Sequence, residues 1–142
     1  MKTQNVAYLI LALLVLVAGG CGVQPPAKAQ ADFDAAFKLT TTLLDGRMVF
    51  LGVGGEIDGM TNPDLVAQTG DMVQVTLING DGMPHDLAIP DLNVQTAMMT
   101  GKGQTAEVVF EISAAGEFAY YCTVSGHRQA GMEGNFIVSV NH

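Results

Sequence analysis

Short runs in which apolar and polar residues alternate dominate the chain beyond about residue 36, and Gly, Asn, Asp and Pro separate them. Because successive side chains of a β-strand point to opposite faces, this alternation predicts strands with one buried face. The runs lie at residues 37–44, 48–53, 71–79, 85–89, 106–112, 118–122 and 136–140. Residues 54–64 predict an irregular loop, and no long amphipathic helix or internal repeat is present. The pattern predicts an all-β fold, a β-sandwich of about seven to eight short strands.

The alternation also predicts which side chains share one face of a strand. The predicted sets are Val73, Val75 and Leu77; Ala106, Val108, Phe110 and Ile112; Phe118, Tyr120 and Cys122; and Phe136, Val138 and Val140. Tyr121 is expected on the opposite face of its strand.

The first twenty residues differ from the rest of the chain. Lys2 is followed by an apolar run from Val6 to Ala18 and then by Gly19-Gly20-Cys21. The run is shorter than the about 20 apolar residues of a membrane span and is typical of a secretory signal peptide, here residues 1–20. Cys21 after Ala-Gly-Gly resembles a bacterial lipobox, in which the cysteine is acylated.

Ala18 departs from that lipobox pattern, since leucine is usual three residues before the cysteine. Plain cleavage or an uncleaved short anchor therefore remain alternatives to lipidation. In each case the domain is exported, and we expect it at the periplasmic or extracytoplasmic face of a bacterial membrane. Residues 21–36, with Pro25-Pro26, predict a lipidated N-terminus and flexible tether, and residues 37–142 a single domain.

The chain is acidic, with a formal net charge of −8 that becomes −9 when cleavage before Cys21 removes Lys2. This charge argues against binding to nucleic acid or direct attraction to anionic lipid. It favours encounter with a partner that has a basic docking face, although solubility alone also explains it. The acidic residues are scattered along the sequence, so they define no docking patch.

One segment carries the chemistry: Cys122-Thr-Val-Ser-Gly-His127-Arg-Gln-Ala-Gly-Met132. It holds a thiolate, an imidazole and a thioether, and this combination of soft sulfur with imidazole suits copper. A second imidazole has to come from elsewhere in the chain. His85 follows the Gly-rich turn at residues 79–82, whereas His142 is the last residue of the chain.

The cysteine count excludes other sites. Only two cysteines are present, Cys21 in the leader junction and Cys122 in the motif, so we expect no disulfide. A dinuclear purple copper centre needs two thiolates in the loop, and structural zinc sites use more Cys or His than this chain supplies.

The motif resembles that of the cupredoxins, the small type 1 copper proteins. His85, then Cys-x4-His-x4-Met after Gly116-Glu-Phe-Ala-Tyr-Tyr121, carries the resemblance, which covers roughly residues 47–140. The chain is similar to auracyanin- and plastocyanin-like proteins and to cupredoxin domains fused to some copper nitrite reductases. The resemblance implies a Greek-key sandwich and one copper per chain. His85, Cys122 and His127 would form its trigonal plane, and Met132 would be the weak axial ligand.

The resemblance also implies roles for residues near the copper. His127 would reach the surface as the electron exit, whereas His85 would be buried. Asp86 stands where many cupredoxins have an asparagine that ties the strand of the first histidine to the residue after the cysteine, here Thr123. Gly126 and Gly131 would allow the loop to turn tightly.

Apolar residues are expected around the copper, where they limit solvent access. The candidates are Met83, Pro84, Met98, Met99 and Ala130. For Met98 and Met99, ordinary core packing is equally consistent with the sequence.

Two further residues have alternative interpretations. Tyr121 resembles the tyrosine beside the cysteine of plastocyanins, where a second electron path could run, or it packs locally. Arg128 either contacts an acidic partner or is solvated.

The resemblance implies a single-electron carrier between exported or membrane-bound redox partners, with no small-molecule substrate and no enzymatic activity. Copper nitrite reduction would need further histidines, and only His142 remains beside His85 and His127. A copper chaperone or reservoir, or an electron-donor module of a copper nitrite reductase system, are the alternatives.

Overall fold

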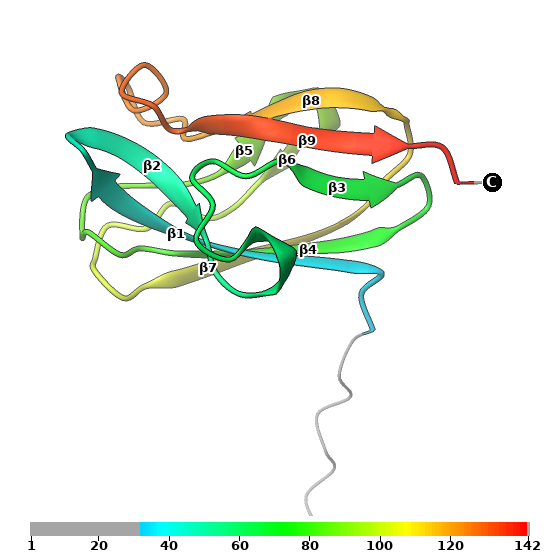
Figure 1. Cartoon of the computed structure of the whole chain (residues 1–142), viewed down its shortest axis with the longest axis horizontal. Helices are drawn as coiled ribbons and strands as arrows, with labels where there is room; N and C mark the ends of the chain where they lie inside the picture. Colours follow the sequence, from blue (N-terminus) through cyan, green and yellow to red (C-terminus); the bar gives the residue numbers. More distant parts are fainter. Residues whose placement is uncertain (1–31, 142) are drawn as a thin grey trace, which may run out of the picture. The chain divides into compact units, whose positions relative to one another are not determined.

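The computed structural model describes residues 32–141, and within them the chain forms two packed β-sheets (Figure 1). The first sheet has the order β2 (Arg47–Gly52), β1 (Ala35–Leu44), β4 (Met72–Ile78) and β7 (Thr105–Glu111). The second has the order β3 (Leu65–Gln68), β9 (Glu133–Ser139), β8 (Gly116–Tyr121), β5 (Ala88–Ile89) and β6 (Val94–Gln95). Two short 3-10 turns, η1 (Gly55–Ile57) and η2 (Pro90–Leu92), lie in the connections. The predicted all-β Greek-key sandwich is confirmed.

Two strand pairs are parallel, β1 with β4 and β3 with β9, and the other pairs are antiparallel. The core lies between the sheets, where the rings of Phe50 and Tyr120 are 5.5 Å apart. The buried Tyr120 hydroxyl donates to the carbonyl of Pro63 at 2.7 Å and so fixes the chain entering β3.

All seven predicted strands are present in whole or in part. β1 begins at Ala35, two residues before the expected start, and only Ala88–Ile89 of the predicted strand at 85–89 is formed. The last predicted strand is one residue too long. β9 ends at Ser139, and Val140, which was predicted on the same face as Phe136 and Val138, is 57% exposed.

Two strands were not predicted, β3 and β6. β3 does alternate between buried and exposed residues, but it pairs in parallel with β9, far away in the sequence. Turn residues flank β3, with Asn62-Pro63 before it and Gly70 after it, but nothing in the local sequence indicates a partner so far away. β6 has only two residues, too few for a periodic pattern to show.

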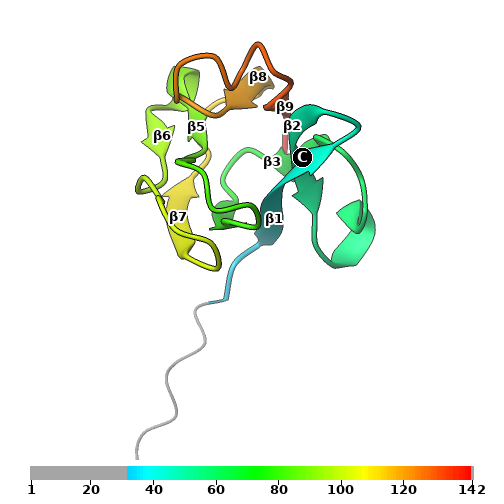
Figure 2. The same cartoon turned by 90° about the vertical axis from the view of Figure 1, so that its left-hand side faces the viewer.

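Three connections meet at one end of the sandwich: the β1–β2 turn, the β4–β5 connection and the β8–β9 loop (Figure 2). The motif residues lie in the last two. Among the described residues, no helix is long and apolar enough to cross a membrane. The expected signal peptide, Cys21, most of the tether and His142 lie outside the described residues.

Candidate metal centre

The β8–β9 loop closes on itself through backbone hydrogen bonds. Cys122 directly follows β8, and its N–H donates to the carbonyl of Met132 at 3.2 Å. The N–H of Met132 donates to the carbonyl of His127 at 3.1 Å, and that of His127 to Val124 at 3.0 Å. The loop therefore brings Met132 back beside Cys122 before β9 begins.

Two glycines allow the loop to turn tightly, as expected. Gly126 and Gly131 have φ angles of 85° and 119°, in the left-handed region that side chains disfavour. A Cβ on Gly131 would also lie 3.0 Å from the carbonyl oxygen of Met48 in β2. The loop thus packs directly on the neighbouring strand.

His85 comes from the β4–β5 connection. Its N–H donates to the carbonyl of Met99 at 2.9 Å, and the N–H of Met99 returns a bond to the carbonyl of His85 at 2.8 Å. The side chain of His85 is fully buried. This two-way bridge fixes the backbone from which the imidazole projects.

Three donor atoms converge on one point. The Nδ1 atoms of His85 and His127 are 3.2 Å apart, and they lie 3.8 and 3.6 Å from the Sγ atom of Cys122. The circle through three points at these separations has a radius of about 2 Å, close to the 2.0–2.3 Å bonds that first-row metals form with imidazole and thiolate. The three donor atoms could therefore all hold one metal ion.

Met132 completes the predicted set. Its side chain is fully buried in the core that also contains Cys122. The hydrogen bonds of its backbone to Cys122 and His127 place it beside both residues. The four predicted ligand positions are thus brought together, and His85, Cys122 and His127 with Met132 are arranged as a type 1 copper site.

The expected bond between Asp86 and Thr123 is present. The backbone N–H of Thr123 donates to Asp86 Oδ1 at 2.7 Å, and its hydroxyl donates to Oδ2 at 2.5 Å. Gln95 adds a third bond to Oδ2 at 2.7 Å. Burial raises the pKa of the Asp86 carboxyl, but these hydrogen bonds outweigh burial and hold the pKa below its ordinary value. Asp86 thereby ties the segment after His85 to the residue after Cys122.

Burial also shifts the pKa values of two candidate ligands, Cys122 and His127. Removal from water raises the pKa of the Cys122 thiol, and the Asp86 carboxylate raises it further. Burial also lowers the pKa of His127, and the neighbouring His85 adds to this effect. A cation bound at the converging atoms offsets the cost of the buried thiolate, and a neutral imidazole is the form that binds it.

Two residues that contact the site were missed by the sequence reasoning. The carboxylate of Asp81 lies 2.9 Å from Nε2 of His85. Asn62 donates from its amide to the carbonyl of Gly131 at 2.7 Å and accepts from the N–H of Phe50 at 2.9 Å. The contact of Asp81 could have been predicted, because Asp81 stands only four residues before His85 in a Gly-rich turn. The contact of Asn62 could not, because Asn62 lies in a loop far from Gly131 in the sequence.

The expected apolar rim is only partly as predicted. Met99 is 3% exposed and packs in the core cluster that also contains Cys122 and Met132. Met98 is 48% exposed, Pro84 is exposed, and Met83 and Ala130 are half-buried.

Arg128 and Tyr121 contact each other. The guanidinium of Arg128 lies 4.0 Å from the centre of the Tyr121 ring and also pairs with Glu133. Arg128 therefore has partners within its own chain, and Tyr121 packs locally beneath it.

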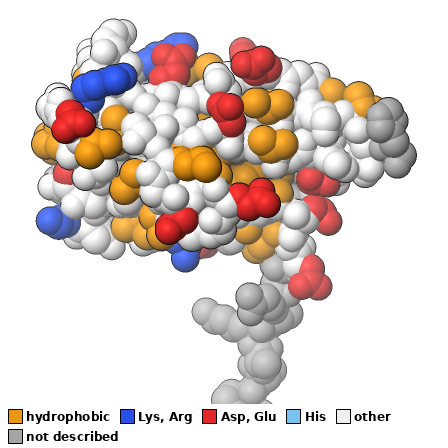
Figure 3. Space-filling view, viewed as in Figure 1, with side chains coloured by type: hydrophobic (Ala, Val, Ile, Leu, Met, Phe, Trp, Pro, Cys, Tyr) orange, Lys and Arg blue, Asp and Glu red, His pale blue; other side chains and the backbone are white. Residues whose placement is uncertain are grey.

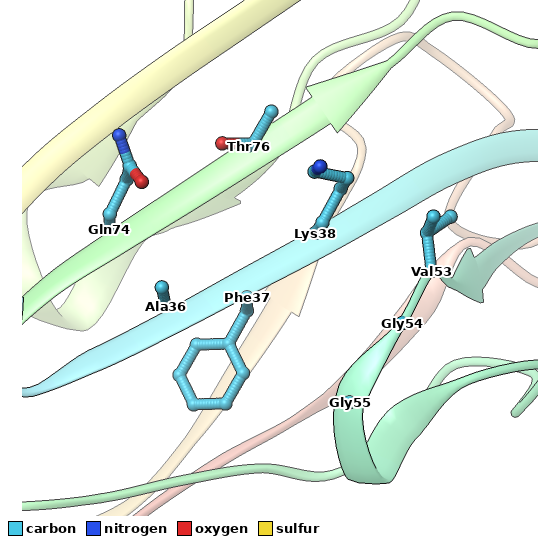
Figure 4. A pocket seen from close by; sticks show the side chains of 8 residues that line it. All are labelled: Ala36, Phe37, Lys38, Val53, Gly54, Gly55, Gln74 and Thr76. Atoms are coloured by element: carbon cyan, nitrogen blue, oxygen red, sulfur yellow. The ribbon is translucent and has the colours of Figure 1, made fainter.

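A hollow lies elsewhere, over β1 and β4 (Figure 4). Lys38 is the only charged residue lining it, and Gln74 and Thr76 supply its other polar side chains. None of its lining residues is a soft or acidic metal ligand, so the converging donors remain the candidate centre.

Comparison with known proteins agrees with this geometry. The family described as copper binding proteins, plastocyanin/azurin family, matches residues 60–139, more than half of the chain and all four predicted ligand positions. The family match and the donor set together identify the cofactor as copper.

The curated relatives are copper-containing nitrite reductases. That of Pseudomonas chlororaphis is 34% identical over 92 residues, which cover 56% of this chain and 24% of the relative. That of Alcaligenes xylosoxydans xylosoxydans is 27% identical over 135 residues, or 82% and 40% of the two chains. This chain thus spans about a quarter to two fifths of the length of the curated relatives it matches.

Solved structures show the same fold. Auracyanin B superposes with a TM-score of 0.54 at 19% identity, covering 76% of this chain and 91% of its own. Rusticyanin from Thiobacillus ferrooxidans superposes with a TM-score of 0.53 at 23% identity, covering 73% of this chain and 76% of its own.

Proposed function

Because the chain belongs to the plastocyanin/azurin family of copper binding proteins, we propose that it is a mononuclear type 1 copper electron-transfer protein. It would shuttle single electrons between exported or membrane-bound redox partners. The observation that carries the proposal is the convergence of Cys122 Sγ with the Nδ1 atoms of His85 and His127 in a buried setting. Copper bound there supplies a one-electron Cu(I)/Cu(II) couple.

The surrounding protein favours a carrier over an enzyme. Backbone hydrogen bonds within the protein hold the His85 segment and the β8–β9 loop in place. Ligands held in this way need little rearrangement when the charge of the site changes, which suits rapid electron transfer. With Met132 in the fourth place, the set leaves no position for a substrate, so we propose no enzymatic activity and no small-molecule substrate.

His127 is the proposed electron exit. It is half-buried, whereas His85, Cys122 and Met132 are buried. Ala130, three residues further along the loop, is also half-buried. Partners that dock over this loop would come closest to the ligands.

The proposed partners are redox proteins with a basic docking face. The net charge of −8 supports a basic partner. On the face shown in Figure 3 the acidic side chains are scattered and form no single patch. The proposed attraction therefore rests on the net charge of the chain. Attraction of this kind should weaken as salt rises.

A second candidate function is that of electron-donor module in a copper nitrite reductase system. The curated relatives favour it, since they are all copper-containing nitrite reductases. The histidines of this chain support an electron donor rather than the reductase itself. The catalytic copper of a reductase would need further histidines, and only His142 remains beyond His85 and His127.

Attachment to the outer face of a bacterial membrane through acylated Cys21 is part of the proposal. It rests on the leader at residues 1–20 and the small residues before Cys21. Fractionation of the native host should find the wild-type protein in the membrane and the Cys21→Ser form in the soluble fraction. Equal membrane binding of both forms would point to an uncleaved anchor instead.

Electron self-exchange tests the function without a known partner. The copper-loaded protein should be blue or green when oxidised and give one reversible couple in voltammetry. Line broadening in NMR spectra of mixed Cu(I) and Cu(II) protein measures the self-exchange rate. Ala130→Glu should slow it without changing the absorption spectrum, because docking would desolvate an unpaired charge. Unchanged exchange would place docking away from His127.

The same copper-loaded protein also distinguishes an electron carrier from a copper chaperone or reservoir. Such a protein would be colourless with Cu(I) and would release its metal readily to a chelator. A carrier should retain copper through repeated oxidation and reduction.

A further inference from the structure

We propose that Asp81 sets the reduction potential of the copper through His85. Its carboxylate accepts a hydrogen bond from the imidazole and stabilises the oxidised centre. Asp81 would be a positioning residue, since it acts on the metal only through a ligand. The inference rests on the copper centre of the proposed function and needs no redox partner.

The two ring nitrogens of His85 face opposite neighbours. Nδ1 lies within 3.8 Å of Cys122 Sγ and 3.2 Å of His127 Nδ1, so it is the atom directed at the metal. Nε2 therefore carries the proton of the neutral ring. It lies 2.9 and 3.1 Å from the two carboxylate oxygens of Asp81. A bond of this kind fixes the orientation of a ligating histidine and strengthens it as a donor.

The contact is shielded from water. The side chain of His85 is fully buried, and that of Asp81 is only 11% exposed. In such surroundings the charge of a carboxylate acts more strongly on its neighbours than at an exposed position.

The turn that carries Asp81 is itself fixed. Asp81 Oδ1 accepts from the backbone N–H of Met83 at 2.9 Å. The fully buried Asn79 accepts from the N–H of Gly82 and donates to the carbonyl of Met83, each at 2.7 Å. The carboxylate is thus held in place by hydrogen bonds within its own turn.

The charge of Asp81 determines the direction of its effect. Cu(II) carries one more positive charge than Cu(I), so a negative group bonded to a ligand favours the oxidised state and lowers the potential. The other carboxylate near the site, Asp86, bonds to Thr123 and Gln95 rather than to His85. Removing the charge of Asp81 should therefore raise the potential.

Voltammetry of three copper-loaded variants tests the proposal. Asp81→Asn keeps an acceptor oxygen but loses the charge, and its potential should rise above that of the wild type. Asp81→Glu keeps the charge and should stay closer to the wild type. Asp71→Asn is the matched control. Asp71 also accepts a backbone hydrogen bond in a turn, but it lies just before the first residue of β4, whereas Asp81 follows the last. Its potential should be unchanged.

Equal potentials for Asp81→Asn and Asp71→Asn would overturn the proposal, as would equal rises for Asp81→Asn and Asp81→Glu. The absorption spectrum should stay that of the wild type, which separates tuning from loss of a ligand. Absence of any redox couple in the wild type would instead refute the proposed function.

A second measurement needs no variant that might fail to fold. In NMR spectra of the diamagnetic Cu(I) protein, the His85 Nε2 proton should be protected from exchange with water. A proton that exchanges freely would also overturn the proposal.

Discussion

Replacing Asp86 by alanine should loosen the link between the two segments that supply the copper ligands. Asp86 is fully buried and accepts three hydrogen bonds, two from Thr123 and one from Gln95. The backbone bond from Thr123 is worth about 1.5–3 kcal/mol, because its acceptor is charged. The side chains of Thr123 and Gln95 are exposed and can turn to water, so their two bonds add little. We expect Asp86→Ala to lower the free energy of unfolding by about 2–3 kcal/mol.

Asp86→Asn is the control. An asparagine oxygen can still accept from the N–H of Thr123, and its amide can donate to the Thr123 hydroxyl. In this variant the amide N–H of Gln95 would face the N–H of the new asparagine amide. The Gln95 side chain is exposed and can rotate, so that its oxygen accepts from the asparagine instead. The expected loss is about 1 kcal/mol or less.

Urea unfolding of the copper-free proteins measures both losses, since bound metal would add its own stabilisation. The copper-loaded Asp86→Ala protein should also lose its metal to a chelator faster than the wild type. A loss below about 1 kcal/mol for Asp86→Ala would refute the reasoning, as would an equal loss for both variants.

Three further outcomes are expected. Cys122→Ala should lose the visible absorption of the copper protein and keep a β-rich circular dichroism spectrum; a variant that stays coloured would contradict the ligand assignment. Met132→Gln should lower the reduction potential measured by voltammetry, because a harder axial oxygen favours Cu(II), and a rise would argue against an axial Met132. Tyr120→Phe should lower the free energy of unfolding by about 1–2 kcal/mol in urea, since the Pro63 carbonyl loses its buried donor. The absorption spectrum of Tyr120→Phe should remain unchanged, and a spectral change would mean that the Tyr120 hydroxyl also supports the ligands.

Patterns that are local in sequence predicted much of the fold and the site. Alternation of apolar residues predicts a strand wherever one face is buried, as in β4 and β8. The spacing of Cys122, His127 and Met132 correctly predicted that they lie together. All three belong to one short loop between two strands, which keeps residues close in sequence close in space. The identity of the donor atoms then restricts the metal, since thiolate, imidazole and thioether favour copper over harder cations.

Contacts between distant segments could not be read in this way. β3 pairs with β9, and Asn62 bonds to Gly131, across large separations in sequence. Alternation gives the face of a strand but not its partner, so neither contact was predicted. The exposure of Val140 has a similar cause, because the pattern continues past the point at which β9 loses its partner strand.

The amino-acid sequence predicted the sandwich and the spacing of Cys122, His127 and Met132. The resemblance to the cupredoxins added the full ligand set and the bond that Asp86 accepts from Thr123. The packing of distant segments was needed to show that Asp81 turns its carboxylate toward Nε2 of His85 and that Met99 lies in the core. The physical reason is that a residue type fixes what a side chain can bond to. The packing of separate segments fixes which of those partners it meets.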